Sequence, residues 1–260
     1  MILPFDEVGE GAPLVLLHAG IADRTMWREQ LTPLADSGRR VLALDLPGFG
    51  EAGIEAGPQA PWDDVLQTLD LLTSGPVALL GNSFGGAVAL RVAAVAPRRV
   101  SALVLISAPA PGGEEQPSEQ LAASWEAEEA ALEAGDTEAA VEAILAAWTL
   151  PGAPPELRER IATMQRRAFL LQQAAPEVSE GPDPLEDRLD ALAALGMPAL
   201  CAAGERDMPD FVVAAREMAG VLPRSQHATI AGAGHLAPLE QPAAFRELVL
   251  GFLDSTAATP

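Results

Sequence analysis

The stretch Val77-Ala78-Leu79-Leu80-Gly81-Asn82-Ser83-Phe84-Gly85-Gly86 decides the fold of this chain. Its first four residues predict a buried strand, and a helical pattern begins directly at the serine. The middle matches G-x-S-x-G in the strand-to-helix context that this pattern requires. A turn this sharp strains the backbone at the serine, and only glycine on either side lets neighbouring backbone pass without a Cβ clash. The stretch therefore predicts an exposed nucleophilic serine, the alternative being a glycine-rich turn with an incidental one.

Short runs of Val, Leu and Ile recur on both sides of this motif, separated by stretches of helical period. This alternation is typical of parallel strands covered by helices on both faces. We therefore predict an α/β fold with a mostly parallel, doubly wound sheet. Strands are expected at 14–17, 41–45, 77–80, 103–107, 199–202 and about 228–230, and the clearest helices at 63–72, 83–95, 210–221 and 242–253.

The alternation of predicted strands and helices stops after Ser107, and no strand is predicted again until after about residue 190. Residues 111–190 hold 18 acidic and 5 basic residues, so this stretch carries 13 of the chain's 21 net negative charges. It is rich in Ala, Glu and Leu at helical spacing, which predicts an all-helical insertion with helices at about 118–134, 136–148 and 156–174. We therefore divide the chain into a core, 1–110 and 186–260, and an insertion, 111–185.

A serine nucleophile needs a general base, and the chain has three histidines. His235 follows the last predicted strand in the flexible loop Ala231-Gly-Ala-Gly-His235, the position that a base requires. His18 ends the first core strand and is interpreted as structural or loop-shaping. His227 precedes the last strand and is interpreted as a solvated loop residue.

The third member of such a site orients the imidazole and stabilises its charge. Asp207 fits this role because its loop follows the strand at 199–202, at the same sheet edge as Ser83. Glu205 and Asp210 are the rivals, although Asp210 suits an N-cap of the helix that starts there. The order Ser83, Asp207, His235 is the one expected when the nucleophile lies in mid-sheet, with each residue at the carboxyl end of a strand.

Together these residues resemble a serine hydrolase of the α/β-hydrolase fold, over nearly the whole chain. The matching pieces are residues 14–20, 45–50, the motif around Ser83, the loop of Asp207, and residues 234–242. The resemblance implies that the helical insertion is a cap, which sits over the serine and shapes the substrate pocket. The family usually opens with a two-stranded hairpin. Only about 13 residues precede the first strand here, so we expect an edge strand to be missing.

Two backbone N–H groups are expected to form an oxyanion hole. Phe84 N–H is a natural donor because it opens the helix after the serine. The resemblance implies a second donor from the loop after His18. Gly20 is favoured, and Ala19 and Ile21 stay open, because the loop reads His-Ala-Gly where His-Gly is commoner.

The favoured function is hydrolysis of a carboxylic ester or related acyl bond of a small, largely apolar substrate, through an acyl-enzyme on Ser83. Serine at this position argues against haloalkane dehalogenases and epoxide hydrolases, which use a carboxylate. The motif also resembles that of C–C bond hydrolases, with Leu236 where those usually carry Trp and with Arg166 or Arg167 to meet a substrate carboxylate. Residues 18–27 resemble enol-lactonases. A ligand-binding or signalling module without turnover is the alternative outside enzymes.

Four large side chains of the insertion could line an apolar substrate pocket or form ordinary core: Trp125, Trp148, Met164 and Phe169. The net charge of −21 disfavours nucleic-acid binding. No apolar run reaches the ~18 residues that span a bilayer, and no Cys/His spacing suggests a metal. Gly48-Phe-Gly50-Glu-Ala-Gly53 matches the dinucleotide-binding pattern G-x-G-x-x-G, but no helix is predicted to start there, so we do not expect a dinucleotide site. Cys201 is interpreted as an inert buried thiol. We expect a cytoplasmic monomer or homodimer without cofactor.

Overall fold

The structure is a computed structural model, and it describes residues 1–113 and 116–257. Seven strands form the central sheet in the order β1-β3-β2-β5-β6-β8-β9. All neighbouring strands are parallel except β1 and β3. The prediction of a mostly parallel sheet is therefore confirmed. The strands are β1 (Phe5–Val8), β2 (Ala12–Leu17), β3 (Arg39–Leu44), β5 (Val77–Asn82), β6 (Val100–Ile106), β8 (Ala199–Gly204) and β9 (Ser225–Ile230).

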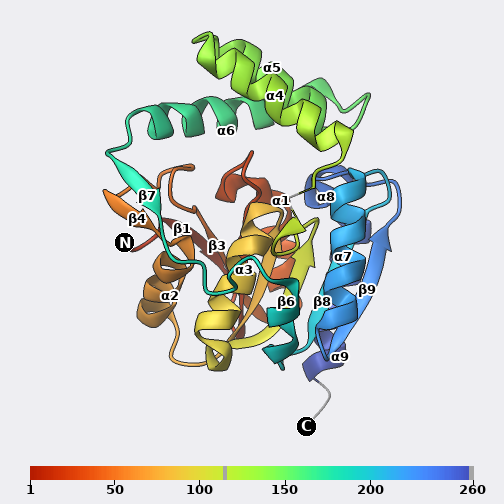
Figure 1. The fold of residues 1–260 in the computed structure, drawn as a ribbon. Coiled ribbons are helices and arrows are strands. Elements are labelled where there is room, and N and C mark those ends of the chain that lie inside the picture. The colour runs from red at the N-terminus through yellow and green to blue at the C-terminus, as the bar shows by residue number, and fades with distance from the viewer. Residues whose placement is uncertain (114–115, 258–260) are drawn as a thin grey trace.

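Helices cover both faces of this sheet, which makes it doubly wound (Figure 1). Alternate strand residues point to opposite faces. Val15 and Leu17 of β2 belong to the core under α2 (Pro61–Leu72), α3 (Phe84–Val95) and α7 (Pro209–Val221). Leu14 and Leu16 belong to the core under α1 (Arg28–Ala35) and α9 (Pro242–Ala257). Both faces are apolar, which explains why the strands read as continuous apolar runs.

The expectation of a missing edge strand is wrong. β1 pairs antiparallel with β3, from Phe5 opposite Leu44 to Val8 opposite Val41. The sequence Phe-Asp-Glu-Val shows no apolar run because β1 lies at the sheet edge, where its residues are at most half-buried. Its acidic side chains meet arginines instead of the core: Glu7 pairs with Arg40. Charged edge strands of this kind resist pairing with other chains.

The other boundaries shift by a few residues. α2 starts at Pro61, two residues before the predicted start, and α9 continues to Ala257. β9 starts at Ser225, so His227 lies on a strand and not in a loop, although it is solvent-exposed as expected. Among the residues described, no helix is both long and apolar enough to cross a membrane.

Three helices of the insertion lie above the carboxyl edge of the sheet (Figure 1). They are α4 (Glu119–Glu133), α5 (Thr137–Trp148) and α6 (Pro155–Gln173), and we call them the helical layer. Ser118 and Asp136 cap the first two, because their side chains accept hydrogen bonds from Leu121 N and Ala139 N. All three helices end within one residue of their predicted bounds.

The prediction that the insertion is all-helical is wrong at its carboxyl end. β7 (Val178–Glu180) pairs in parallel with β4 (Gly57–Gln59) as a separate two-stranded sheet. Further backbone hydrogen bonds close both ends of the pair, from Gly57 N to Glu177 O and from Gly181 N to Gln59 O. All three β7 residues are exposed. Because its side chains are exposed, this strand leaves no apolar pattern in the sequence.

Candidate active site

Ser83 stands between the end of β5 and the start of α3, with φ 52° and ψ −119°. Positive φ is unfavourable for a residue with a Cβ, so the surrounding backbone must enforce it. A Cβ at Gly81 would lie 2.2 Å from Gly85 O, and one at Gly85 would lie 2.3 Å from Leu17 O. Both obstacles are main-chain atoms of the packed sheet edge. The glycines of the motif are therefore required by the close approach of the backbone here.

Asp207 and His235 are joined by a hydrogen bond of 2.9 Å, from His235 Nδ1 to Asp207 Oδ1. They follow β8 and β9, which are neighbours in the sheet. The Asp207 side chain is fully buried, and its Oδ1 also accepts from Met208 N at 2.8 Å. A carboxylate at Nδ1 keeps the proton on that nitrogen, which leaves Nε2 as the basic nitrogen.

Ser83 and His235 line one cavity of about 260 Å³ between the sheet edge and the helical layer. In the described part of the chain no hydrogen bond joins the side chains of Ser83 and His235. Further core residues at this cavity are Gly20, Ile21, Phe84, Ala87, Pro109 and Phe211, and the helical layer contributes Leu121, Trp125, Glu128, Ile144, Trp148 and Gln165.

The rival acids have other partners. Glu205 accepts a hydrogen bond from Gly232 N at 2.9 Å. Asp210 accepts from the backbone N and the hydroxyl of Ser118, at 2.8 and 2.5 Å. The prediction that Asp210 caps its own helix is therefore wrong: Met208 holds the N-cap position. Pro209 is the first residue of α7, so Asp210 lies in the first turn. There the hydrogen bonds of Asp210 to Ser118 connect α7 to the start of α4.

The other two histidines lie away from the cavity. His18 is fully buried: its Nδ1 donates to Ala19 O at 2.8 Å and its Nε2 accepts from Leu46 N at 2.9 Å. Burial lowers the pKa of His18 and keeps the ring neutral. It shapes the loop that follows β2, as its sequence position indicates.

The N–H of Phe84 lies next to two backbone N–H groups that already have acceptors. Ser83 N donates to Ile106 O and Gly85 N donates to His18 O. Phe84 N lies between them at the start of α3, where no intrahelical acceptor exists. On the facing loop, Gly20 and Ile21 line the cavity, whereas Ala19 is fully buried. A Cβ on Gly20 would lie 3.4 Å from Phe84 Cβ, so this loop packs against the head of α3.

Two of the four side chains that the sequence offered for the pocket lie at the cavity. Trp125 and Trp148 line it. The structure places Met164 and Phe169 in the apolar core instead, the alternative that the sequence left open. Phe211 was missed because one aromatic residue in an amphipathic helix carries no signal of its own. Its ring centroid lies 4.4 Å from that of His235, and the Trp148 ring lies 4.6 Å from His235 on another side.

Two further residues that the sequence did not single out hold the His235 loop. Asn82 is buried, and its Nδ2 donates to Ile106 O and to His235 O, at 3.2 and 3.1 Å. The carboxylate of Glu240 accepts from Gly234 N at 2.7 Å and from Leu150 N at 3.3 Å, which joins this loop to the end of α5. Burial raises the pKa of Glu240, and the two N–H donors oppose this shift.

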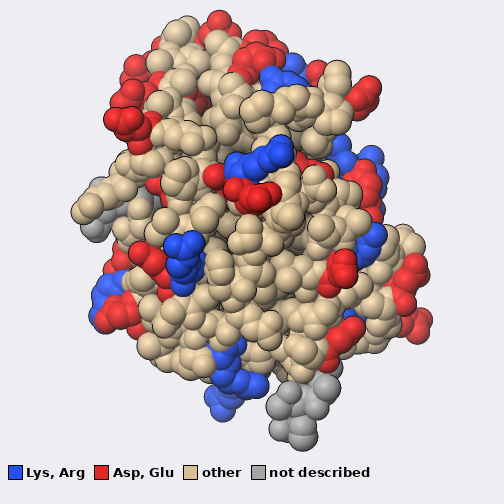
Figure 2. Space-filling view, turned by 90° about the vertical axis from the view of Figure 1, so that its right-hand side faces the viewer, with Lys and Arg blue, Asp and Glu red and all other residues tan. Residues whose placement is uncertain are grey.

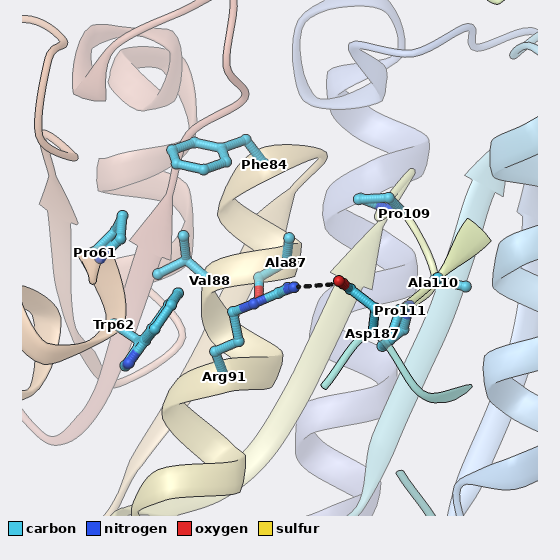
Figure 3. Close-up of a pocket in the computed structure, with 11 residues that line it drawn as sticks. Pro61, Trp62, Phe84, Ala87, Val88, Arg91, Pro109, Ala110, Pro111 and Asp187 are labelled. Atoms are coloured by element: carbon cyan, nitrogen blue, oxygen red, sulfur yellow. Dashed lines mark hydrogen bonds and ion pairs between the residues drawn. The ribbon is translucent and has the colours of Figure 1, made fainter. Parts of the chain in front are cut away.

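A second hollow of about 550 Å³ lies along α3 beyond Phe84 (Figure 3). It shares the side chains of Phe84, Ala87 and Pro109 with the Ser83 cavity. Figure 3 shows Arg91 reaching across it toward Asp187, with 3.6 Å between the charged groups. Arg91 also pairs with Asp183 at 2.8 Å. Apart from this charged cluster the walls are mainly apolar, with Trp62 on the α2 side.

Most charged residues of the helical layer lie on its outer surface, and Glu128 at the cavity is an exception. Acidic side chains gather over the top of the molecule (Figure 2). Arg166 is paired with Glu138 and Glu159, and Arg167 donates to Gly50 O. Neither arginine lines the Ser83 cavity. The structure therefore does not bring them to the position that a C–C hydrolase substrate would require.

Cys201 and a bound metal ion were the remaining candidates for chemistry at the site. Cys201 is buried in β8, and burial raises the pKa of its thiol to about 12, so the thiolate is disfavoured. Within residues 1–113 and 116–257, no three His, Cys, Asp or Glu side chains are grouped closely enough to bind a metal ion.

Comparison with known proteins agrees with this architecture. A family model described as the alpha/beta hydrolase fold matches residues 12–242. A solved esterase structure from Thermogutta terrifontis has 29% sequence identity and a TM-score of 0.80, covering 98% of this chain and 93% of that one. The fold is that of an α/β hydrolase. The chain belongs to the α/β hydrolase fold family.

Two curated relatives with higher identity match over a shorter stretch of this chain. The dihydrolipoyllysine-residue acetyltransferase component of the acetoin cleaving system of Pseudomonas putida is 44% identical over 108 residues, which are 40% of this chain and 29% of that protein. The 2-hydroxy-6-oxo-2,4-heptadienoate hydrolase of Pseudomonas putida is 40% identical over 108 residues, 39% of each chain. The chain thus matches well under half of the length of these relatives. Their names cover different reactions, so they do not select one.

Proposed function

We propose that this protein is a serine hydrolase that cleaves carboxylic esters of small, largely apolar substrates. Ser83 is the nucleophile, His235 the general base and acid, and Asp207 the residue that orients the imidazole. One observation carries the proposal. The strained Ser83 lines the same cavity as His235, whose Nδ1 bonds at 2.9 Å to the buried Asp207.

The proposed reaction has two halves. His235 Nε2 takes the Ser83 proton as Oγ attacks the ester carbonyl, and then protonates the leaving alcohol. Phe84 N–H and Gly20 N–H stabilise the oxyanion of each tetrahedral intermediate. Water, activated by the same histidine, then releases the acid from Ser83. Asp207 orients the ring through its hydrogen bond to Nδ1 and stabilises the imidazolium while it exists.

The substrate class follows from the walls of the cavity. Trp125, Trp148, Ile144 and Phe211 supply an apolar surface. The helical layer lies above the carboxyl edge of the sheet and shares the cavity with Ser83. We propose that residues 111–185 act as the cap of the enzyme over the core of 1–110 and 186–260. A cytoplasmic location and a monomeric or homodimeric state belong to the same proposal.

A C–C bond hydrolase is the second candidate, supported by the 40% identity to the Pseudomonas hydrolase over part of the chain. The placement of Arg166 and Arg167 outside the cavity favours the ester hydrolase, and so does Leu236 after the histidine. An enol-lactonase would use the same residues as the esterase.

Hydrolysis of p-nitrophenyl acetate, butyrate and octanoate by the wild type, His235→Gln and His227→Gln tests the proposal. We expect activity in the wild type and in His227→Gln, which alters an exposed strand residue. His235→Gln should lose at least about a thousandfold in kcat because no base remains for Ser83. Equal activity in the two histidine variants would contradict the proposal.

A further inference from the structure

Two polar side chains of the helical layer interrupt the apolar wall of the Ser83 cavity. Gln165 comes from α6 and Glu128 from α4. Gln165 is only 3% exposed, and its Oε1 is buried without a hydrogen-bond partner. Among the described residues, no side chain or backbone group donates a hydrogen bond to this oxygen.

An unpaired buried amide oxygen is unfavourable, since it has lost its hydrogen bonds to water and gained none. A leucine of similar size would fill this place without that penalty. The amide oxygen and nitrogen exchange places by a half-turn, so the group can offer the cavity either an acceptor or a donor. Gln165 is thus suited to a polar ligand group that arrives from the cavity.

Glu128 adds a second hydrogen-bonding group to the same wall. It is half-buried and pairs with no arginine among the described residues. Burial raises the pKa of its carboxyl group, which eases protonation and hydrogen bonding as a neutral acid. When ionised, it repels an anionic ligand. The ionised state thus disfavours a ligand carboxylate, and in either state Glu128 can accept a hydrogen bond from an uncharged hydroxyl or amide.

We propose that Gln165, assisted by Glu128, selects esters that carry an uncharged hydrogen-bonding group, a hydroxyl or an amide, away from the scissile carbonyl. This inference rests on the proposed function and narrows its substrate class. Apolar side chains would hold the hydrocarbon part, and Gln165 would satisfy its amide only when such a ligand is bound. A site with buried polar groups discriminates against analogues that leave them unpaired.

The test compares matched esters in a pH-stat assay. The substrates are ethyl hexanoate, ethyl 3-hydroxyhexanoate, ethyl 3-acetamidopropanoate and monoethyl succinate, and the proteins are the wild type, Gln165→Leu and Gln173→Leu. The last variant makes the same substitution at an exposed position of the same helix. The wild type and Gln173→Leu should prefer the hydroxyl or the amide ester over ethyl hexanoate by about tenfold or more in kcat/KM, and should hydrolyse the anionic ester poorly.

Gln165→Leu should lose this preference through a tenfold to hundredfold fall for the polar ester, while kcat/KM for ethyl hexanoate is maintained or increases. Unchanged hydrolysis of ethyl hexanoate shows that the variant folds. Glu128→Gln should relieve the discrimination against monoethyl succinate. The same ratio of polar to alkyl ester in the wild type and Gln165→Leu would overturn the inference, and so would a wild-type preference for the alkyl ester.

Binding separates this inference from the hydrolase proposal. In Ser83→Ala, ligand affinity is measured by the fluorescence of the tryptophans, two of which line the cavity. If the wild type hydrolyses no ester, the proposed function fails. The inference then stands if two results are obtained. Ser83→Ala binds ethyl 3-hydroxyhexanoate or ethyl 3-acetamidopropanoate about tenfold tighter than ethyl hexanoate, and adding Gln165→Leu to Ser83→Ala removes the difference. It falls if the affinities are equal.

Discussion

The sheet edge and the helical layer form opposite walls of one cavity, and they are built differently. At the sheet edge the backbone fixes each group: close-packed glycines strain Ser83, and Asn82 holds the carbonyl of His235. In the helical layer only side chains reach the cavity, and one of them, Gln165, has an unpaired buried oxygen. This difference separates reactivity from selectivity. Changes at the edge should affect every substrate alike, and changes in the layer should affect the choice among substrates.

The largest effect is expected at the edge, in Asp207→Asn. The amide would favour the wrong imidazole tautomer, and kcat should fall by roughly 10³ to 10⁴ for every ester, whatever its acyl group. Asp210→Asn, three residues later, is the control because Asp210 bonds to Ser118 and not to His235. A loss confined to some esters would remove the distinction between edge and layer.

A structural test of the edge is Gly85→Ala. The added Cβ would lie 2.3 Å from Leu17 O, an atom fixed in the sheet, so we expect the free energy of unfolding to fall by about 3 kcal/mol. Urea titration measures this loss. Gly75→Ala should change little, because no atom lies within 4 Å of its Cβ position. Equal stability of both variants would show that the edge tolerates more than its packing suggests.

The wall between the two hollows offers an intermediate case. Ala87 lines both, so Ala87→Phe should place a larger side chain between them, beside Phe84. We expect kcat/KM to fall about tenfold for p-nitrophenyl octanoate and much less for the acetate, because only the longer chain needs the second hollow. Val95→Phe places the same ring at an exposed position of α3 and should leave both unchanged. An equal loss for both esters would mean that Ala87→Phe disturbs Ser83 itself.

The smallest effect concerns the link between edge and layer at Glu240. Its pKa is raised by burial, so the folded protein binds more protons than the unfolded chain between the ordinary and the raised pKa. Stability should therefore fall as pH rises through that window. Relative to Glu240→Gln, the wild type should show this extra decline in urea titrations at several pH values. Glu247→Gln, at an exposed position of α9, should follow the wild type. If the stability of Glu240→Gln depended on pH in the same way as that of the wild type, Glu240 would not be the cause of the decline.

The sequence predicted those features that local patterns encode. Strands buried on both faces are continuous apolar runs, and the glycines around Ser83 are required by local sterics, so the central strands and the motif were found. β1 and β7 were missed because edge pairing through the backbone requires no apolar side chains. Asp207 and His235 were placed by their positions after strands. Phe211 and Gln165 reach the cavity only through tertiary packing, which a single sequence does not show.

Labelling of the wild type, Ser83→Ala and Ser74→Ala with a fluorophosphonate probe tests the central claim most directly. Ser74 is an exposed serine between α2 and β5 and serves as the control. Mass spectrometry of the peptide that contains Ser83 should show one adduct in the wild type and in Ser74→Ala, and none in Ser83→Ala, together with loss of ester hydrolysis in that variant alone. A folded wild type that neither labels at Ser83 nor hydrolyses esters would contradict the assignment of Ser83 as the nucleophile.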